Sequence, residues 1–98
     1  MDFNKLEIHD SSVDKLEYDI EREELVVTGK KWCDSIKSTK TYCLVFKHVG
    51  SISIPNAQPW GKSNSVNSQT FRDGEYSIEL QSGDIIKVCA SSCEAVGI

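Results

Sequence analysis

The chain has 98 residues, of which 39% are apolar and 27% are charged, and its net charge is −4. This length fits a single domain, residues 1–98, and the composition is that of a globular protein. The acidic balance argues against general nucleic-acid binding. No apolar run is long enough to span a bilayer and no basic-then-apolar start is present, so we expect a cytoplasmic protein that does not associate with membranes.

Alternation of apolar and polar side chains predicts strands in the first part of the chain. Residues 5–9 and 15–20 both alternate with period two, and turn-forming side chains lie between them at residues 9–12. A four-residue loop at 21–24 then leads into a partner strand at 25–28. The first quarter of the chain is therefore expected to be strand and hairpin.

The hairpin at residues 14–24 is the most acidic part of the chain. It holds six carboxylates against two basic side chains, whereas residues 30–47 hold five lysines against one aspartate. Opposite charge speeds encounter between proteins, so this hairpin is a candidate face for a basic protein partner. The alternative is a solvated hairpin edge, the common state of charge runs. The candidate partner-binding residues are Asp14, Glu17, Asp19, Glu21, Glu23 and Glu24.

Residues 29–40 form a polar excursion that can be two strands with a basic tip at 34–40. Lysines beside Trp32 are able to hold a phosphate backbone and stack a base, although the acidic total disfavours this. The apolar run at 42–46 predicts a central strand covered on both faces, and a further strand follows at 51–54.

The alternation of apolar and polar side chains decides the length of the loop in the final hairpin. A two-residue loop would mix the two faces, whereas a three-residue loop at 81–83 pairs Ile78 with Ile86 and Tyr76 with Val88. The longer loop also places a glycine at the left-handed position that such loops need. We therefore predict the three-residue loop.

Seven to eight short strands with short turns, and no convincing helical stripe, predict an all-β fold. The expected architecture is an antiparallel β-sandwich or a flattened barrel. An edge strand can pair across the axis of a homodimer, and residues 1–8 and 84–90 are the candidates. The predicted core consists of Leu6, Ile8, Leu16, Tyr18, Ile20, Leu25, Val27, Leu44, Phe46, Ile52, Ile54, Ile78, Leu80, Ile86 and Val88.

The loop at residues 58–67 interrupts the strand pattern and carries a tryptophan. A large ring in a small domain is usually core, so we expect Trp60 to plug an open end of the sandwich while the loop crosses between its two halves. The alternative is an aromatic plate flanked by amides, which would make a carbohydrate or small-ligand binding module. The residues of that alternative site are Trp60, Gln58, Asn64 and Asn67.

A small enzyme that uses His9 or a cysteine is a further alternative. Residues 9–11 place histidine, aspartate and serine side by side, but adjacent side chains diverge and do not form a triad. The four cysteines are spaced C-x9-C and C-x3-C, which is not the spacing of zinc knuckles. We therefore expect neither a metal nor another cofactor, and favour a protein without enzyme activity.

Three stretches carry a further signal: residues 8–11 (IHDS), residues 58–63 (QPWGKS) with 66–67 (VN), and residues 76–86 (YSIELQSGDII). They resemble a family of small bacterial all-β proteins of uncharacterised function, some of which are similar to immunity proteins of polymorphic toxin systems. The resemblance covers most of the chain and implies no catalytic residues. Together with the acidic hairpin, it favours a non-enzymatic protein-binding module that occludes a protein partner.

Overall fold

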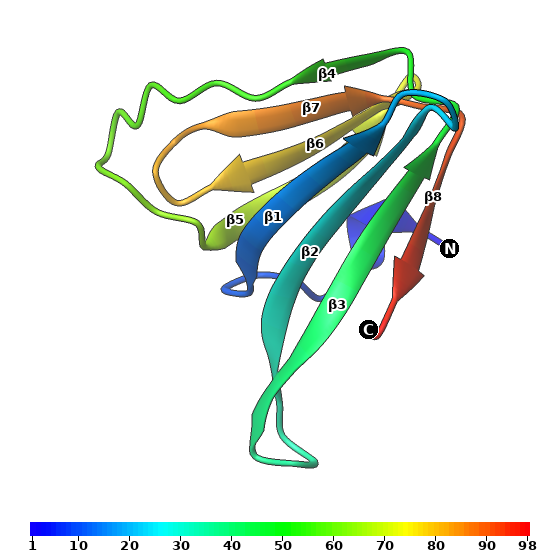
Figure 1. The fold of residues 1–98 in the computed structure, drawn as a ribbon. Coiled ribbons are helices and arrows are strands. Elements are labelled where there is room, and N and C mark those ends of the chain that lie inside the picture. The colour runs from blue at the N-terminus through cyan, green and yellow to red at the C-terminus, as the bar shows by residue number, and fades with distance from the viewer.

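A computed structural model describes all 98 residues and shows an all-β sandwich of eight strands (Figure 1). Two antiparallel four-stranded sheets pack together without closing into a barrel, so the sandwich is confirmed and the flattened barrel is wrong. The first sheet has the order β1 (Ser12–Asp19), β2 (Glu24–Cys33), β3 (Ser38–Lys47) and β8 (Ser92–Val96). The second has the order β4 (Ser51–Ser53), β7 (Ile85–Cys89), β6 (Glu75–Leu80) and β5 (Val66–Arg72).

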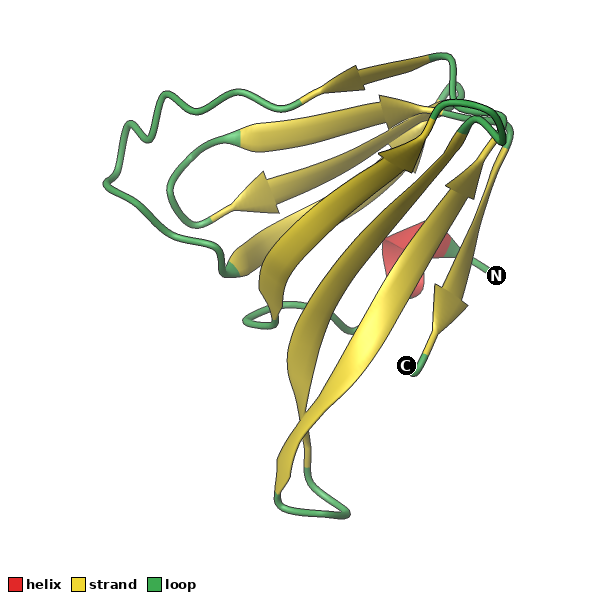
Figure 2. Ribbon diagram, viewed as in Figure 1, coloured by secondary structure: helices red, strands yellow, loops and turns green.

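The helical content is one 3-10 turn, η1 (Phe3–Lys5), which packs beside β5 (Figure 2). Asn4 fixes this turn, because its side-chain carbonyl accepts from the Phe71 amide at 2.8 Å and its amide donates to the Phe71 carbonyl at 3.4 Å. No helix of the chain is long and apolar enough to cross a membrane. The strand expected at residues 5–9 is therefore wrong, since η1 and an extended loop occupy this part of the chain.

The last hairpin has the predicted register. Ile78 faces Ile86 and Tyr76 faces Val88, so one apolar face is kept across the turn. Gly83 has a φ of 92°, a left-handed conformation that suits glycine. The three-residue loop is confirmed.

The other hairpins follow the sequence pattern with small shifts. The β1–β2 loop has the predicted four residues, but it spans 20–23 rather than 21–24, because Asp19 pairs with Glu24. The β2 and β3 strands extend through most of the polar excursion and pair as far as Cys33 and Ser38. In Figure 1 this hairpin projects well beyond the sandwich.

The two segments proposed as dimer edges are not edge strands. Residues 1–8 contain no strand, and β7 lies between β4 and β6 with pairing on both sides. The edges of the sheets are instead β1, β8, β4 and β5. Any pairing between copies of the chain would have to use one of these four.

Apolar side chains from both sheets and from η1 form one core. Eight predicted core residues are buried, four more pack partly buried against the core, and Tyr18, Ile20 and Ile54 are exposed, so those three predictions are wrong. Phe3 and Tyr76 meet edge to face with ring centres 5.0 Å apart. The buried core consists of Phe3, Ile8, Val13, Leu25, Val27, Tyr42, Leu44, Phe46, Val49, Val66, Tyr76, Ile78, Ile86, Val88 and Cys93.

The sheets meet at one end and splay apart at the other (Figure 1). At the meeting end the β1–β2 loop lies beside the β3–β4 connection, and the Val49 amide donates to the Glu23 carbonyl at 2.9 Å. At the splayed end the start of β1 is joined to the start of β5, because the Val13 amide donates to Asn64 and the Val66 amide donates to Ser11, both at 2.8 Å. The candidate sites lie at these two ends.

Candidate functional site

The acidic hairpin, residues 14–24, runs along β1 and has its loop, residues 20–23, at the meeting end of the first sheet. Its loop is held in shape by Asp19, whose carboxylate accepts from the Arg22 amide at 3.1 Å. Of its carboxylates, Glu17 is in an ion pair, with Lys15 at 3.1 Å, and both side chains are exposed. Exposed pairs of this kind neutralise little charge, so the hairpin keeps a net charge of −4.

Two large apolar side chains are exposed among these carboxylates. Tyr18 is 44% exposed and Ile20 is 80% exposed, although the alternation of β1 predicts both as core. Tyr18 does point to the inner face, toward Ser51 and Ile52 of β4, but β1 and β4 are both sheet edges and the space between them is open to solvent. Ile20 lies in the loop, beyond the last paired residue of β1. The acidic hairpin therefore exposes two apolar side chains, while Glu17 and Asp19, which alternate with Tyr18, lie on the outer face of β1.

A hollow of about 480 Å³ lies on this hairpin and is open to solvent. Tyr18 and Val26 supply its apolar lining, and Arg22 is its basic member. Four of its six lining residues are charged, so this hollow offers a partner polar contacts more than apolar ones. The hollow is lined by Glu17, Tyr18, Asp19, Arg22, Glu24 and Val26.

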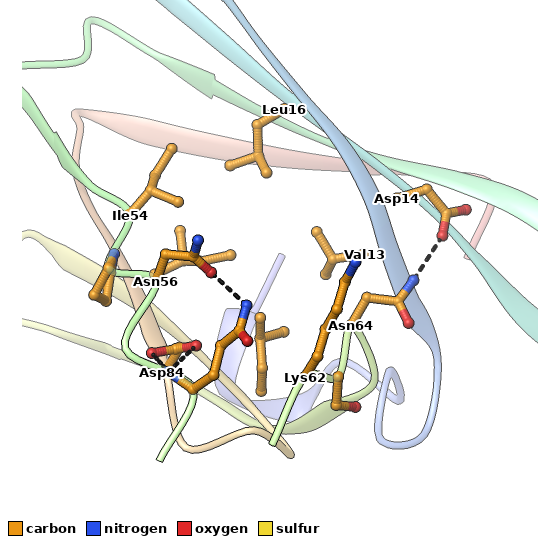
Figure 3. Close-up of a pocket in the computed structure, with 13 residues that line it drawn as sticks. Val13, Asp14, Leu16, Ile54, Asn56, Lys62, Asn64 and Asp84 are labelled. Carbon is orange, nitrogen blue, oxygen red and sulfur yellow. Dashed lines mark hydrogen bonds between the residues drawn. The ribbon is translucent and has the colours of Figure 1, made fainter. Parts of the chain in front are cut away.

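Asp14 is separated from the other five predicted partner-binding residues. It lies near the start of β1 in a β-bulge, where the register with β2 shifts between Val13 and Lys15. Its carboxylate accepts from the side-chain amide of Asn64 at 3.1 Å (Figure 3). Asp14 therefore belongs to the splayed end of the sandwich and not to the acidic surface around Tyr18.

A cavity of about 670 Å³ opens between the sheets at the splayed end (Figure 3). Its apolar side chains, which include Val13, Leu16 and Ile54, come from β1, the end of β4 and the β6–β7 hairpin. Its polar rim comes mostly from the loop between β4 and β5. Asp14, Gln58 and Asn64 are the sequence-predicted residues that line it. Its volume lies in the range of small-molecule pockets.

Asp84 fixes the loop that forms this rim. Its carboxylate is buried and accepts from the amides of Ala57 at 2.9 Å and Gln58 at 3.0 Å, and from the hydroxyl of Ser82 at 3.1 Å. A buried carboxylate needs such donors, so this contact couples the loop to the β6–β7 turn. Nothing in the residue pattern around Asp84 predicts this role.

Trp60 does not plug the sandwich. Its side chain is 79% exposed, and its backbone amide donates to the Ser82 carbonyl at 2.9 Å. The loop joins β4 and β5, which are the two edges of the same sheet, and so passes around the end of that sheet. The predicted crossover between the two halves is therefore wrong, and the ring lies outside against Gly83.

Asn67 accompanies Trp60 on this outer surface. It is the extra residue of a bulge in β5, and its side-chain amide donates to the Glu79 carboxylate at 2.6 Å. The two residues line a shallow hollow of about 300 Å³ with Glu79, Leu80, Gln81 and Gly83. The four residues of the alternative ligand site are thus divided, with Gln58 and Asn64 in the cavity and Trp60 and Asn67 outside it.

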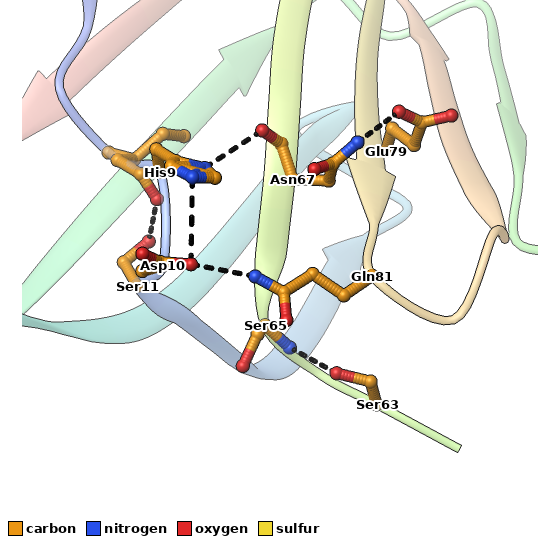
Figure 4. Close-up of polar contacts among 9 residues, drawn as sticks. His9, Asp10, Ser11, Ser63, Ser65, Asn67, Glu79 and Gln81 are labelled. Carbon is orange, nitrogen blue, oxygen red and sulfur yellow. Dashed lines mark hydrogen bonds and ion pairs between the residues drawn. The ribbon is translucent and has the colours of Figure 1, made fainter. Parts of the chain in front are cut away.

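Polar contacts bring together the three stretches on which the family resemblance depends (Figure 4). His9 Nδ1 lies 3.0 Å from the Asn67 carbonyl, and the Gln81 side-chain amide donates to the Asp10 carboxylate at 2.7 Å. The Ser11 hydroxyl donates to the Ile8 carbonyl and therefore does not pair with His9. These contacts hold the turn before β1 against β5 and β6.

The cysteines carry free thiols in different environments. Burial, with a smaller effect of Glu94, raises the pKa of Cys93 to about 12, so this thiol stays protonated at neutral pH. A hydrogen bond from Ser35 lowers the pKa of Cys33, which lies at the tip of the β2–β3 hairpin. No group of three or more histidine, cysteine or acidic side chains is arranged to hold a metal ion.

Comparison of the chain with protein-family models, curated proteins and solved structures found no match.

Proposed function

We propose that this chain is a non-enzymatic bacterial protein-binding module of the cytoplasm, immunity-like, that occludes a basic surface of a partner protein with its acidic hairpin. The observation that carries the proposal is the exposure of Tyr18 and Ile20 on a hairpin that carries six carboxylates. An exposed tyrosine and isoleucine supply the desolvation energy, and the carboxylates select and steer a basic partner.

The loop geometry supports a recognition surface that is formed before binding. The hairpin tip is braced by the contact of Asp19 with Arg22 and by the bond from Val49 to Glu23. A surface that is already ordered loses little conformational entropy on binding. Burial of Tyr18 at an interface centre is then worth about 2 kcal/mol, or roughly thirtyfold in affinity.

The experiment is to purify the chain with the product of the neighbouring gene and to look for a complex by size exclusion at micromolar concentration. A complex that weakens as salt is raised is expected, because surface charges are screened. Y18A and I20S should both weaken it, while V96S, which changes a 56% exposed apolar side chain on another edge strand, should not. The absence of any complex would remove the proposal.

A carbohydrate or other small ligand bound at Trp60 is a second candidate function. The exposure of this ring favours it, since an aromatic plate beside the side chains of Asn67, Glu79 and Gln81 offers both stacking and hydrogen bonds. A glycan panel read by Trp60 fluorescence in a W32F background tests it. A spectrum that no glycan shifts would count against this candidate, and the matched W60F variant should respond to none.

A further inference from the structure

The hairpin of β2 and β3 has an end that, beyond Lys30, pairs with no other strand. We call residues 30–41 the basic finger. None of its residues is buried, and in Figure 1 it projects from the splayed side of the first sheet. It holds four lysines and one aspartate, a net charge of +3 in a chain whose total is −4. The finger is therefore a protrusion with a charge opposite to that of the protein.

Two of these lysines face each other directly. Lys31 pairs with Lys40 across β2 and β3, so their side chains leave the same face of the hairpin. Like charges at such positions destabilise a hairpin. None of the finger lysines is in any of the four ion pairs of the structure. The one carboxylate nearby, that of Asp34, accepts from Trp32 Nε1 at 2.7 Å. An external anion would relieve this repulsion.

The finger also exposes two large apolar side chains. Trp32 is 58% exposed and Ile36 is 59% exposed. Trp32 lies opposite Thr39, on the face of the hairpin turned away from the paired lysines, while Ile36 lies in the turn. Exposed apolar side chains beside unneutralised lysines are features of an interface whose occupant is both acidic and partly apolar.

We propose that the basic finger docks into an acidic groove of a partner protein, with carboxylates between Lys31 and Lys40 and the ring of Trp32 against a wall of the groove. The proposal concerns a second surface and does not rest on the function of the acidic hairpin. The narrow shape of a two-stranded hairpin fits a concave site. The acidic remainder of the chain disfavours extended polyanions, because nucleic acid or an anionic membrane would also meet the carboxylates of the body.

Fluorescence of Trp32 tests this directly in a W60F background, where it is the only tryptophan. The probe is a synthetic acidic peptide in which glutamate alternates with leucine. Single-stranded oligothymidylate and phosphatidylglycerol vesicles are the comparison probes. The peptide is expected to shift the Trp32 emission to shorter wavelength, with a midpoint that rises as salt is added.

The paired variant K31T/K40T separates binding from folding. It should weaken peptide binding roughly tenfold, since two charge contacts are lost. It should also raise the midpoint of thermal unfolding, because the like-charge pair is removed and threonine suits a strand. K62T removes an exposed lysine outside the finger and should leave both quantities unchanged.

Four results would overturn the proposal. The first is that the peptide leaves the Trp32 emission unshifted, and the second is that it binds K31T/K40T as tightly as it binds the parent chain. The third is that oligothymidylate or the vesicles bind the finger at least as tightly as the peptide does. The fourth is salt-sensitive self-association through the finger, which would make a second copy of this chain the occupant. Loss of complex formation in Y18A with peptide binding intact would leave the finger proposal standing.

Discussion

Gly29 is the glycine at which an added Cβ would come closest to another atom, and its replacement by alanine tests how the splayed end is held together. A Cβ at position 29 would lie 1.8 Å from the carbonyl oxygen of Ser12 and 2.9 Å from a ring carbon of Tyr42. Neither can yield easily, because the Ser12 carbonyl belongs to the backbone of β1 and also accepts from the Tyr42 hydroxyl at 2.9 Å. G29A must therefore push β1 away from β2.

The cost follows from the contacts that this shift disrupts. Overpacking of a filled site costs about 1–3 kcal/mol. Loss of the bond from Tyr42 to Ser12 adds about 1 kcal/mol. A total of about 3 kcal/mol is a large share of the stability of a small domain and corresponds to a fall in melting temperature of roughly 12–24 °C.

Urea unfolding followed by circular dichroism measures this, with G50A as the matched control. A Cβ at Gly50 would lie 3.9 Å from its nearest neighbour atom, the carbonyl oxygen of Cys89, which is ordinary contact. G50A should therefore be neutral or slightly stabilising, since alanine restricts the unfolded chain. Equal urea midpoints for G29A and G50A would refute the argument that β1 rests on the bare backbone of Gly29.

Three further predictions concern the finger, the loop and the thiols. K40E places a carboxylate opposite Lys31 and should stabilise the chain by about 1 kcal/mol in urea unfolding, whereas K37E, in the turn, should not. D84A removes the acceptor for the amides of Ala57 and Gln58 and should cost about 3 kcal/mol and change Trp60 fluorescence, while E7A, which truncates an exposed side chain, should do neither. Iodoacetamide at pH 8 should label Cys33 first and Cys93 last, and mass spectrometry measures the order of labelling. The pKa of Cys93 is raised from 9.0 in the unfolded chain to about 12 in the folded protein, so the thiol ionises first in the unfolded chain. The free energy of unfolding should therefore fall as the pH rises from 9 toward 12.

Period two and turn chemistry predicted the parts of the fold that depend on neighbours along the chain. The register of Ile78 with Ile86 follows from parity together with the left-handed requirement at Gly83, and both are local properties. The same logic located the acidic hairpin to within one residue. Sequence reasoning succeeded where a strand and its partner are joined by a short loop.

The alternation of side chains does not predict which inner-face residues the opposite sheet covers. Alternation places Tyr18 and Leu16 on the inner face of β1, but it does not say how far the facing strand extends. Since β1 and β4 are both edge strands and the space between them is open, Tyr18 remains 44% exposed, and Ile54 lies in the loop beyond β4. The exposure of Tyr18 therefore became visible only when the strand order of the two sheets was known.

Strand order decided the position of the Trp60 loop. Its composition predicts a loop correctly, but a plug over the core requires that the loop cross between sheets. The order of the second sheet makes β4 and β5 its two edges, so the loop goes around that sheet and leaves Trp60 outside. The bulges that change the direction of the Asp14 and Asn67 side chains likewise depend on how β1 pairs with β2 and β5 with β6. The sequence pattern does not predict these bulges.

Strand β2 connects the two proposed docking surfaces, since it starts in the acidic hairpin at Glu24 and ends in the basic finger at Cys33. Nine residue steps of a strand span roughly 30 Å, which is several times the Debye length of about 8 Å at physiological salt. The two ends should therefore act independently. K31T/K40T should leave the affinity of the acidic hairpin for its partner unchanged at physiological salt, and Y18A should leave peptide binding by the finger unchanged. If either variant altered binding at the far end, β2 would have to transmit a structural change, and the view of this chain as a rigid module with two separate surfaces would be wrong.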